Sequence, residues 1–112
     1  MRMYKLKISP EAVNDLSEIK SYISQELCNP QAAIKLVSKI MVKIRRLSEY
    51  PQIGAPLTHV VDIQTDYRFL VCANYLIFYR CEGEDIFVSR IVYGRRDHMR
   101  VLFREQLEDE EK

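Results

Sequence analysis

The chain has 112 residues, of which 47% are hydrophobic and 29% are charged, and its formal net charge is +1. A chain of this length can bury a core without disulfides or a metal ion, and its composition excludes the disordered and fibrous classes of protein. We therefore expect one domain spanning residues 1–112.

The first predicted element is a strand near residues 4–8, where Tyr4, Leu6 and Ile8 alternate with lysines. A helix is expected to follow directly, with Ser9 as its N-cap and Pro10 in its first turn. The apolar residues of this helix recur at helical spacing: Ala12, Leu16, Ile19, Ile23 and Leu27.

A second helix is predicted after a short link, with Asn29 as its cap and Pro30 as its first residue. Its apolar stripe comprises Ala33, Val37, Ile40, Ile44 and Leu47. The two helices should form a hairpin whose apolar stripes face each other or a sheet. We interpret the lysines at positions 35, 39 and 43 as a solvated face.

The segment 50–59 is expected to be irregular, because it contains two prolines and a glycine. Three antiparallel strands should follow at 67–72, 75–81 and 86–93, with a tight turn at Ala73-Asn74 in which the asparagine tolerates a positive φ. Asp97 could cap a last helix, and the acidic residues 105–112 should be frayed. The predicted class is α+β with the order β-α-α-β-β-β-α, in which an antiparallel meander packs against the N-terminal helical hairpin.

The three cysteines contain no C-x-x-C pair, so their spacing favours neither a zinc site nor a disulfide framework. We expect Cys72 and Cys81 to be buried thiols within strands. Because no apolar run approaches 18 residues and the N-terminus has no signal-peptide pattern, we expect a cytoplasmic protein with no membrane partner.

Arginine dominates the second half of the chain, since all seven basic residues of positions 67–104 are arginines. The stretch "VYGRRDHMR", residues 92–100, is called here the arginine segment. Arginine forks match phosphate oxygens, so the sequence predicts a surface that binds phosphate or an acidic target. The candidate binding residues are Arg68, Arg90, Arg95, Arg96 and Arg100.

A structural role is the alternative for individual members of this set, with Arg90 paired to Asp97 or Glu84. His98 could act as a general acid or base near neutral pH. His59 and His98 do not have the spacing of metal ligands, and there is no glycine-rich phosphate loop. We therefore expect neither a metal nor a cofactor.

Several segments together resemble the RelE/ParE family of bacterial toxins from type II toxin–antitoxin systems. They are "ISPEAVNDLSEIKSYIS", the Pro-x-x-Gly loop of "RRLSEYPQIG", and "YRFLVCANYLIFYRCEGEDIFVSRIVYGRRDHMRVLF". The resemblance covers residues 3–104. It implies a compact α+β toxin that a cognate antitoxin holds inactive, and that meets operator DNA only through this antitoxin.

The resemblance leaves the target open, because RelE-like members cleave mRNA on the ribosome and ParE-like members poison DNA gyrase. In the RelE reading, the catalytic residues would be His98, Arg96, Arg68 and Tyr93. However, Leu102 stands where that pattern has a tyrosine, and residues 47–66 contain no Lys or Arg where it has lysines. The long helical hairpin, residues 10–49, looks more like ParE. We favour gyrase inhibition, with ribosome-dependent mRNA cleavage as the alternative and a non-toxic binding module of the same fold as a third possibility.

Overall fold

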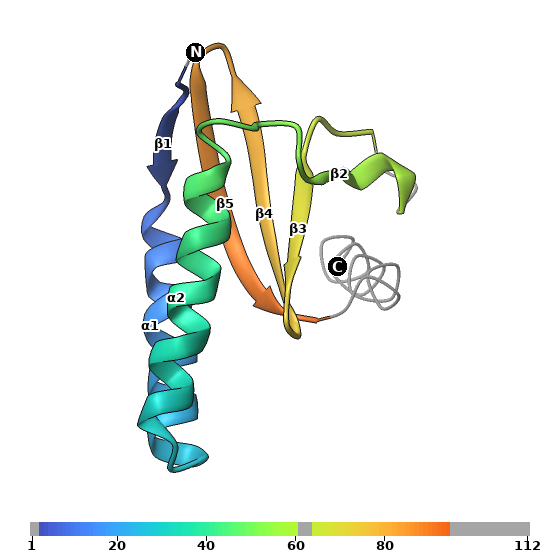
Figure 1. Cartoon of the computed structure of the whole chain (residues 1–112). Helices are drawn as coiled ribbons and strands as arrows, with labels where there is room; N and C mark the ends of the chain where they lie inside the picture. The colour runs from blue at the N-terminus through green and yellow to red at the C-terminus, as the bar shows by residue number, and fades with distance from the viewer. Residues whose placement is uncertain (1–2, 61–63, 95–112) are drawn as a thin grey trace.

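The structure of the protein, a computed structural model, describes residues 3–60 and 64–94 (Figure 1). It contains the predicted helical hairpin followed by the predicted antiparallel meander. The predicted last helix and the acidic tail lie outside the described residues. In chain order the elements are β1 (Lys5–Ile8), α1 (Pro10–Ser21), a π-helical segment (Tyr22–Glu26), α2 (Pro30–Arg46), β2 (Ala55–Pro56), a 3₁₀ helix (Leu57–His59), β3 (Arg68–Cys72), β4 (Tyr75–Glu82) and β5 (Asp85–Tyr93).

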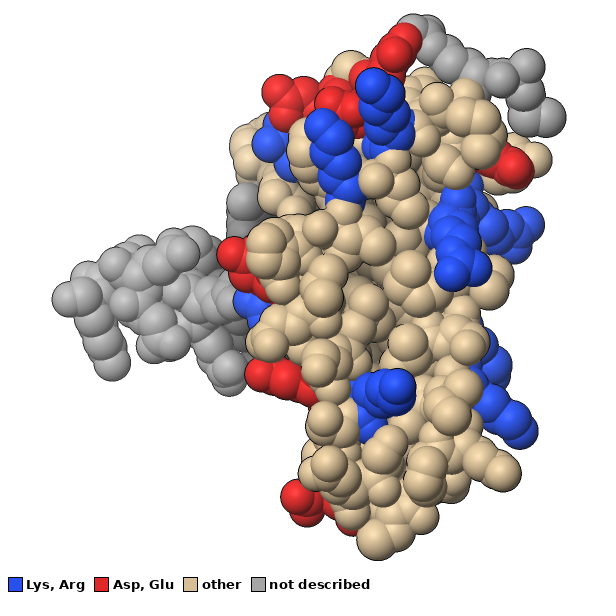
Figure 2. All heavy atoms as spheres, turned by 90° about the vertical axis from the view of Figure 1, so that its left-hand side faces the viewer, with Lys and Arg blue, Asp and Glu red and all other residues tan. Residues whose placement is uncertain are grey.

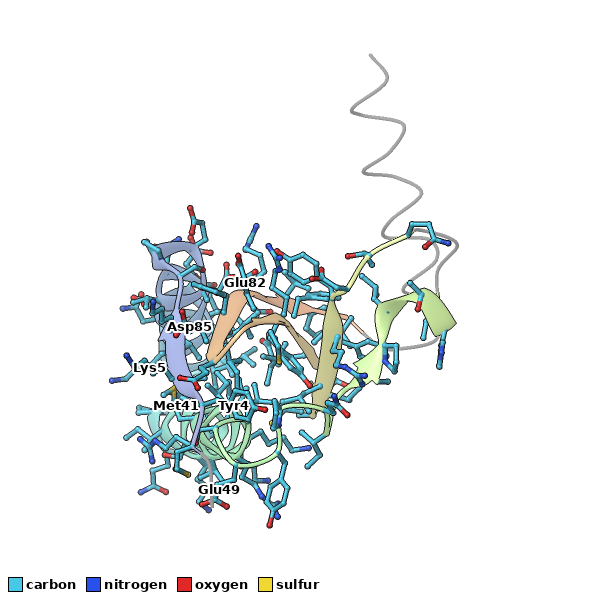
Figure 3. The ribbon with its side chains drawn as sticks, turned by 90° about the horizontal axis from the view of Figure 1, so that it is seen from above. Tyr4, Lys5, Met41, Glu49, Glu82 and Asp85 are labelled. Atoms are coloured by element: carbon cyan, nitrogen blue, oxygen red, sulfur yellow. The ribbon has the colours of Figure 1, made fainter. Side chains whose placement is uncertain are left out.

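The described strands form one sheet with the order β1-β5-β4-β3-β2. β1 pairs in parallel with β5, and the other pairs are antiparallel. The first and last of these strands are therefore neighbours, with Lys5 opposite Asp85 in the view from above (Figure 3). The two helices lie side by side over one face of the sheet, and the tip of the hairpin extends beyond the ends of the strands (Figure 1).

Both predicted helix caps are confirmed by their hydrogen bonds. Ser9 Oγ accepts from the Ala12 amide at 3.0 Å, and Asn29 Oδ1 accepts from the Ala32 amide at 3.1 Å. The Ser9 hydroxyl also donates to the Ser89 carbonyl at 2.7 Å, so the cap ties the start of α1 to β5. The end of the first helix differs from the prediction, because α1 continues as a π-helical turn and Leu27 is 57% exposed instead of facing the core.

Two apolar clusters cover the two faces of the sheet. On the helical face, side chains of both helices pack on β4 and β5, with Ile40, Ile44 and Tyr79 fully buried. On the opposite face, the 3₁₀ helix contributes Leu57 to a second cluster with Phe69, Leu76 and Phe78. β4 is thus buried on both faces, which explains its unbroken apolar run "YLIFY".

Two local predictions are wrong. The segment 50–59 is not entirely irregular, because its last half forms β2 and the 3₁₀ helix. In the β3–β4 turn the positive φ belongs to Ala73, at +54°, and Asn74 is not among the residues with positive φ. A positive φ at the first central position alone is the pattern of a type II′ turn, which matches the twist of a hairpin.

The cysteine predictions hold for Cys72, which is 3% exposed, whereas Cys81 is half-buried and Cys28 is exposed. All three are free thiols. Burial raises the pKa of the Cys81 thiol, which keeps it protonated. Within residues 3–60 and 64–94, no helix is long and apolar enough to cross a membrane.

Candidate functional site

A groove lies between the overhanging tip of the helical hairpin and the ends of the strands, and we call it the hairpin groove. It has a volume of about 870 Å³. One wall is formed by α1, the π-helical segment and Leu36 of α2, and the other by the β3–β4 turn and the end of β5. The Leu27 amide donates to the Tyr22 carbonyl at 3.3 Å, so the chain makes a wide turn at this wall. Turns of this kind occur frequently at functional sites.

Arg90 and Asp15 form an ion pair inside the hairpin groove. Arg90 Nε and Nη2 donate to the two carboxylate oxygens of Asp15 at 2.8 and 3.0 Å, and the Ile91 amide donates to Asp15 Oδ2 at 2.9 Å. The pairing of β4 with β5 shifts register next to Arg90, between Phe78 and Tyr79. Such a shift re-aims side chains, and here it accompanies an arginine that reaches from the sheet to α1.

The environment of this pair keeps both groups charged. Burial alone would raise the pKa of Asp15, which is 7% exposed. The hydrogen bonds from Arg90 and Ile91 and the charge of Arg90 outweigh burial, so this pKa lies below its usual value. The bond to Asp15 raises the pKa of Arg90. Since the Arg90 side chain remains 53% exposed, it can still meet a ligand on its outer side.

Three tyrosines line the same groove as the ion pair: Tyr22, Tyr75 and Tyr93. The rings of Tyr75 and Tyr93 meet edge to face, with centroids 5.5 Å apart. Tyr93 is 70% exposed and Tyr22 is 53% exposed, which is unusual for such large side chains. Burial, together with Tyr93 and Tyr22, raises the pKa of Tyr75, so its hydroxyl is a neutral hydrogen-bond donor. Exposed tyrosines that share a groove with an arginine are a composition typical of protein-binding hot spots.

Arg68 is not part of the hairpin groove. It lies on β3, and its Nη1 donates to the carbonyls of Gly54 at 2.7 Å and Gln52 at 3.4 Å. The same loop is held by Tyr79, whose hydroxyl accepts from the Gly54 amide and donates to the Pro51 carbonyl, both at 2.9 Å. The Pro-x-x-Gly loop of residues 51–54 is therefore fixed by hydrogen bonds from two strand side chains.

The predicted site residues thus separate into three groups. Arg90 and Tyr93 share the hairpin groove, and Arg68 braces the loop 51–54. The partner of Arg90 is Asp15, where the sequence suggested Asp97 or Glu84. The remaining predicted residues, Arg95, Arg96, His98 and Arg100, and also Asp97, lie outside the described residues.

Sequence reasoning missed three residues of the groove: Asp15, Tyr22 and Tyr75. The sequence did indicate that Asp15 is buried, because Ala12, Asp15 and Ile19 have the spacing of one face of a helix. A carboxylate on a buried stripe calls for a cationic partner. The tyrosines carried no such signal, because their meeting depends on how the hairpin overhangs the strands.

The described part of the hairpin groove is suited to binding. It offers a guanidinium, two exposed phenol rings and the apolar side chains of Ile19, Ile23 and Leu27. Among residues 3–60 and 64–94 no three His, Cys, Asp or Glu side chains lie close enough together to hold a metal ion.

The chain is similar to a known protein family and to solved structures. The model of the family "ParE toxin of type II toxin-antitoxin system, parDE" matches residues 6–98. Among solved structures, the chain is similar to one titled "Chromosomal ParDE TA system from P. aeruginosa", with a TM-score of 0.68 and 24% identity over 83% of this chain and 98% of that one. It is also similar to one titled "The crystal structure of the toxin-antitoxin complex RelBE2" from Mycobacterium tuberculosis, with a TM-score of 0.60 and 16% identity over 87% of this chain and 97% of that one. A comparison with curated proteins gave no match.

Proposed function

The chain belongs to the ParE toxin family of type II toxin–antitoxin systems, and from this premise we propose that it arrests growth by binding DNA gyrase and is neutralised by a cognate antitoxin. The hairpin groove is the target-binding surface in this proposal. Its tyrosines and Arg90 supply large, partly exposed side chains of the kind that dominate binding energy in protein complexes. The arginine segment begins inside this groove, at Val92 and Tyr93.

One observation favours target binding over mRNA cleavage as the activity of the chain. Arg68 falls on a catalytic arginine of the RelE pattern, yet its guanidinium is bonded to loop carbonyls, at 2.7 Å to Gly54. A catalytic arginine would have to direct these donors at a phosphate. In this chain they hold the loop 51–54 in place, which supports a structural role for Arg68.

The likeness to the RelBE2 structure does not favour cleavage, because at 16% identity it concerns the fold. A nuclease would need a proton-transfer group beside the phosphate. His98 is the first candidate by sequence, and it lies outside the described residues. Cleavage of mRNA would therefore require a proton-transfer group such as His98, whereas binding to gyrase would not.

Inducible expression in a bacterial host tests the proposal. We expect growth arrest, and we expect co-expression of the neighbouring reading frame to restore growth. Tyr93→Ala should weaken toxicity by removing an exposed groove side chain, whereas His98→Ala should leave it nearly intact. Tyr50→Ala is a matched control, because Tyr50 is also exposed, at 51%, but does not line the groove. Loss of toxicity in His98→Ala with full toxicity in Tyr93→Ala would overturn the proposal.

A further inference from the structure

Helix α2 carries positive charge that no acidic residue of the same helix offsets. Five of its 17 residues are Lys or Arg, and none is Asp or Glu. By contrast, α1 contains one lysine, Lys20, and three acidic residues, Glu11, Asp15 and Glu18. Figure 2 shows Lys and Arg side chains gathered mostly toward one edge of the helical side of the molecule and Asp and Glu mostly toward the other. The helical hairpin therefore consists of an acidic helix and a basic one.

Four of the five cations lie along one flank of α2, and we call them the α2 basic stripe: Lys35, Lys39, Lys43 and Arg46. Their spacing of three or four residues keeps them on one side of the helix, and all four are exposed. The stripe is about 16 Å long, because a helix rises by about 1.5 Å per residue. One of the three hydrogens of Lys43 Nζ is donated to the Val71 carbonyl at 2.7 Å, which leaves two for a ligand.

The charges of the α2 basic stripe are not used to hold the fold together. Within residues 3–60 and 64–94, no ion pair involves a residue of the stripe. Lysines four positions apart on a helix repel each other, so the stripe costs α2 some stability. The sequence alone suggested a solvated face, but a helix surface that serves only solubility usually mixes both signs of charge, as α1 does. We therefore look for an anionic partner that compensates for the repulsion.

The composition of the stripe favours a phosphate backbone over a protein or a membrane. Lysine is depleted at protein interfaces, whereas it is a common partner of the phosphate oxygens of DNA. A helix that binds a membrane surface inserts its apolar face into the lipid, but the apolar face of α2 is buried in the core through Ile40, Ile44 and Leu47. Duplex DNA carries one negative charge per about 1.7 Å of its axis, so it offers phosphates along the whole stripe.

We propose that the α2 basic stripe binds the phosphate backbone of duplex DNA, without sequence preference, while the hairpin groove binds the protein target. This inference rests on the proposed function for the source of the DNA, which is the duplex held by gyrase. The two surfaces share no residue, since Leu36 is the one residue of α2 that lines the hairpin groove. Protein and DNA can therefore be bound at the same time. The DNA contact would direct the chain to gyrase molecules that already hold a duplex.

Binding of a short fluorescent DNA duplex of arbitrary sequence to the purified full chain, without gyrase, tests the stripe by itself. Fluorescence anisotropy is measured over a range of salt concentrations. The logarithm of the binding constant should fall with the logarithm of the salt concentration with a slope of about −3 to −4, because each of four phosphate contacts contributes about −0.9. A binding constant that does not depend on salt, or no binding at low salt, would overturn the proposal.

Charge-neutralising variants of the two helices provide a matched comparison. Lys39→Gln should reduce the magnitude of the salt slope by about 1, and the double variant Lys35→Gln/Lys39→Gln should reduce it by about 2. Lys20→Gln makes the same change of charge at an exposed position on α1, and it should leave the slope as it is in the unaltered chain. Because neutralising the stripe removes repulsion, its variants should unfold at the same temperature as the unaltered chain or at a higher one. A loss of DNA binding is then not a loss of the fold.

The same variants separate this proposal from the proposed function in an assay of gyrase-linked DNA breaks. If the chain causes breaks and the double variant behaves like Lys20→Gln in both assays, the stripe proposal is wrong and the gyrase proposal stands. If the double variant loses duplex binding and the unaltered chain causes no breaks, the DNA-binding site stands and the gyrase proposal falls. Tighter binding to a duplex RNA of the same length, or to vesicles containing phosphatidylglycerol, would assign the stripe to another anion and overturn the inference.

Discussion

Asp15 is a carboxylate on the buried stripe of α1, and its three hydrogen bonds compensate for its removal from water. The contact joins α1 to β5 at the floor of the hairpin groove. It therefore links the stability of the fold to the position of Arg90, which the proposed function uses.

Replacing Asp15 by Asn should lower the free energy of unfolding at pH 7 by about 1–3 kcal/mol, because it removes the charged partner of Arg90. Since the pKa of Asp15 is depressed in the folded chain, its stabilisation is fully present above the unfolded-state pKa of about 3.9. This stabilisation is lost as the pH falls through the lower pKa that Asp15 has in the folded chain. Urea unfolding at pH 7 and at about pH 2–3 should show the difference between the two proteins shrinking in acid.

Glu26→Gln serves as the control for this prediction, because Glu26 is an exposed carboxylate of the π-helical segment that follows α1 and does not line the hairpin groove. It should change stability by no more than about 0.5 kcal/mol. An Asp15→Asn variant that is as stable as Glu26→Gln would mean that the ion pair contributes nothing to the fold.

Tyr79 shows how one hydroxyl can hold a loop. Its ring is fully buried, and its hydroxyl bonds to two backbone groups of the loop 51–54. Gly54 is required here for close approach, since a Cβ would lie 2.6 Å from the Tyr79 hydroxyl and 2.7 Å from the Phe69 carbonyl. This contact gives a physical reason for the glycine of the Pro-x-x-Gly loop.

Tyr79→Phe should lower the free energy of unfolding by about 1–3 kcal/mol, because the Gly54 amide loses its bonding partner in a buried place. Thermal unfolding of the variant measures this loss. Tyr50→Phe is the control, as Tyr50 is exposed, and its unfolding temperature should not change. Equal stability of the two variants would contradict the role assigned to the Tyr79 hydroxyl.

At the scale of elements, the two hairpin turns of the meander solve the same geometric problem with different residues. The β4–β5 turn places Gly83 at φ +61°, whereas the β3–β4 turn places Ala73 at φ +54°. An alanine in this region is strained, and a glycine is not. The β3–β4 turn is therefore the less favourable of the two.

Exchanging these residue types should move stability in opposite directions. Ala73→Gly should raise the free energy of unfolding by about 0.5–1 kcal/mol, because it relieves the backbone strain. Gly83→Ala should lower the free energy of unfolding by about 1 kcal/mol. Because a Cβ at this position meets nothing within 4 Å, the loss would come from backbone strain and not from a steric clash. Chemical denaturation of both variants checks the pair, and changes of the same sign would contradict the turn assignment.

Elements with local signals could be predicted from the sequence. Ser9 and Asn29 marked both helix starts, and the aromatic and β-branched runs marked β3, β4 and β5. The π-helical turn at Tyr22–Glu26 could not be predicted, because the spacing of Ile19 and Ile23 suits an ordinary helix. The parallel pairing of β1 with β5 also escaped prediction, since it joins residues about 80 positions apart and has no local signature.

The candidate site could be predicted only in part, because some of its residues lie far apart in the sequence. Arg90 and Tyr93 were recognisable because they lie close to other arginines in the sequence. Their structural neighbours Asp15 and Tyr22 come from the first quarter of the chain and meet them only after folding. The structural role of Arg68 depends on a loop carbonyl 14 positions away, which no sequence pattern reveals.

At the scale of the whole molecule, the hairpin groove brings together two distant parts of the chain. Tyr22 and Leu27 come from the helical hairpin, and Arg90 and Tyr93 come from β5.

The central claim is that the chain acts by binding gyrase and does not cut mRNA, and one paired measurement tests it directly. The purified chain is added to gyrase with supercoiled DNA and, in parallel, to a purified translation system. We predict that cleaved DNA bound to gyrase accumulates while mRNA stays intact, and that Tyr93→Ala lowers the yield of breaks whereas His98→Ala does not. Codon-phased mRNA cuts that disappear with His98→Ala, together with intact DNA, would contradict the claim.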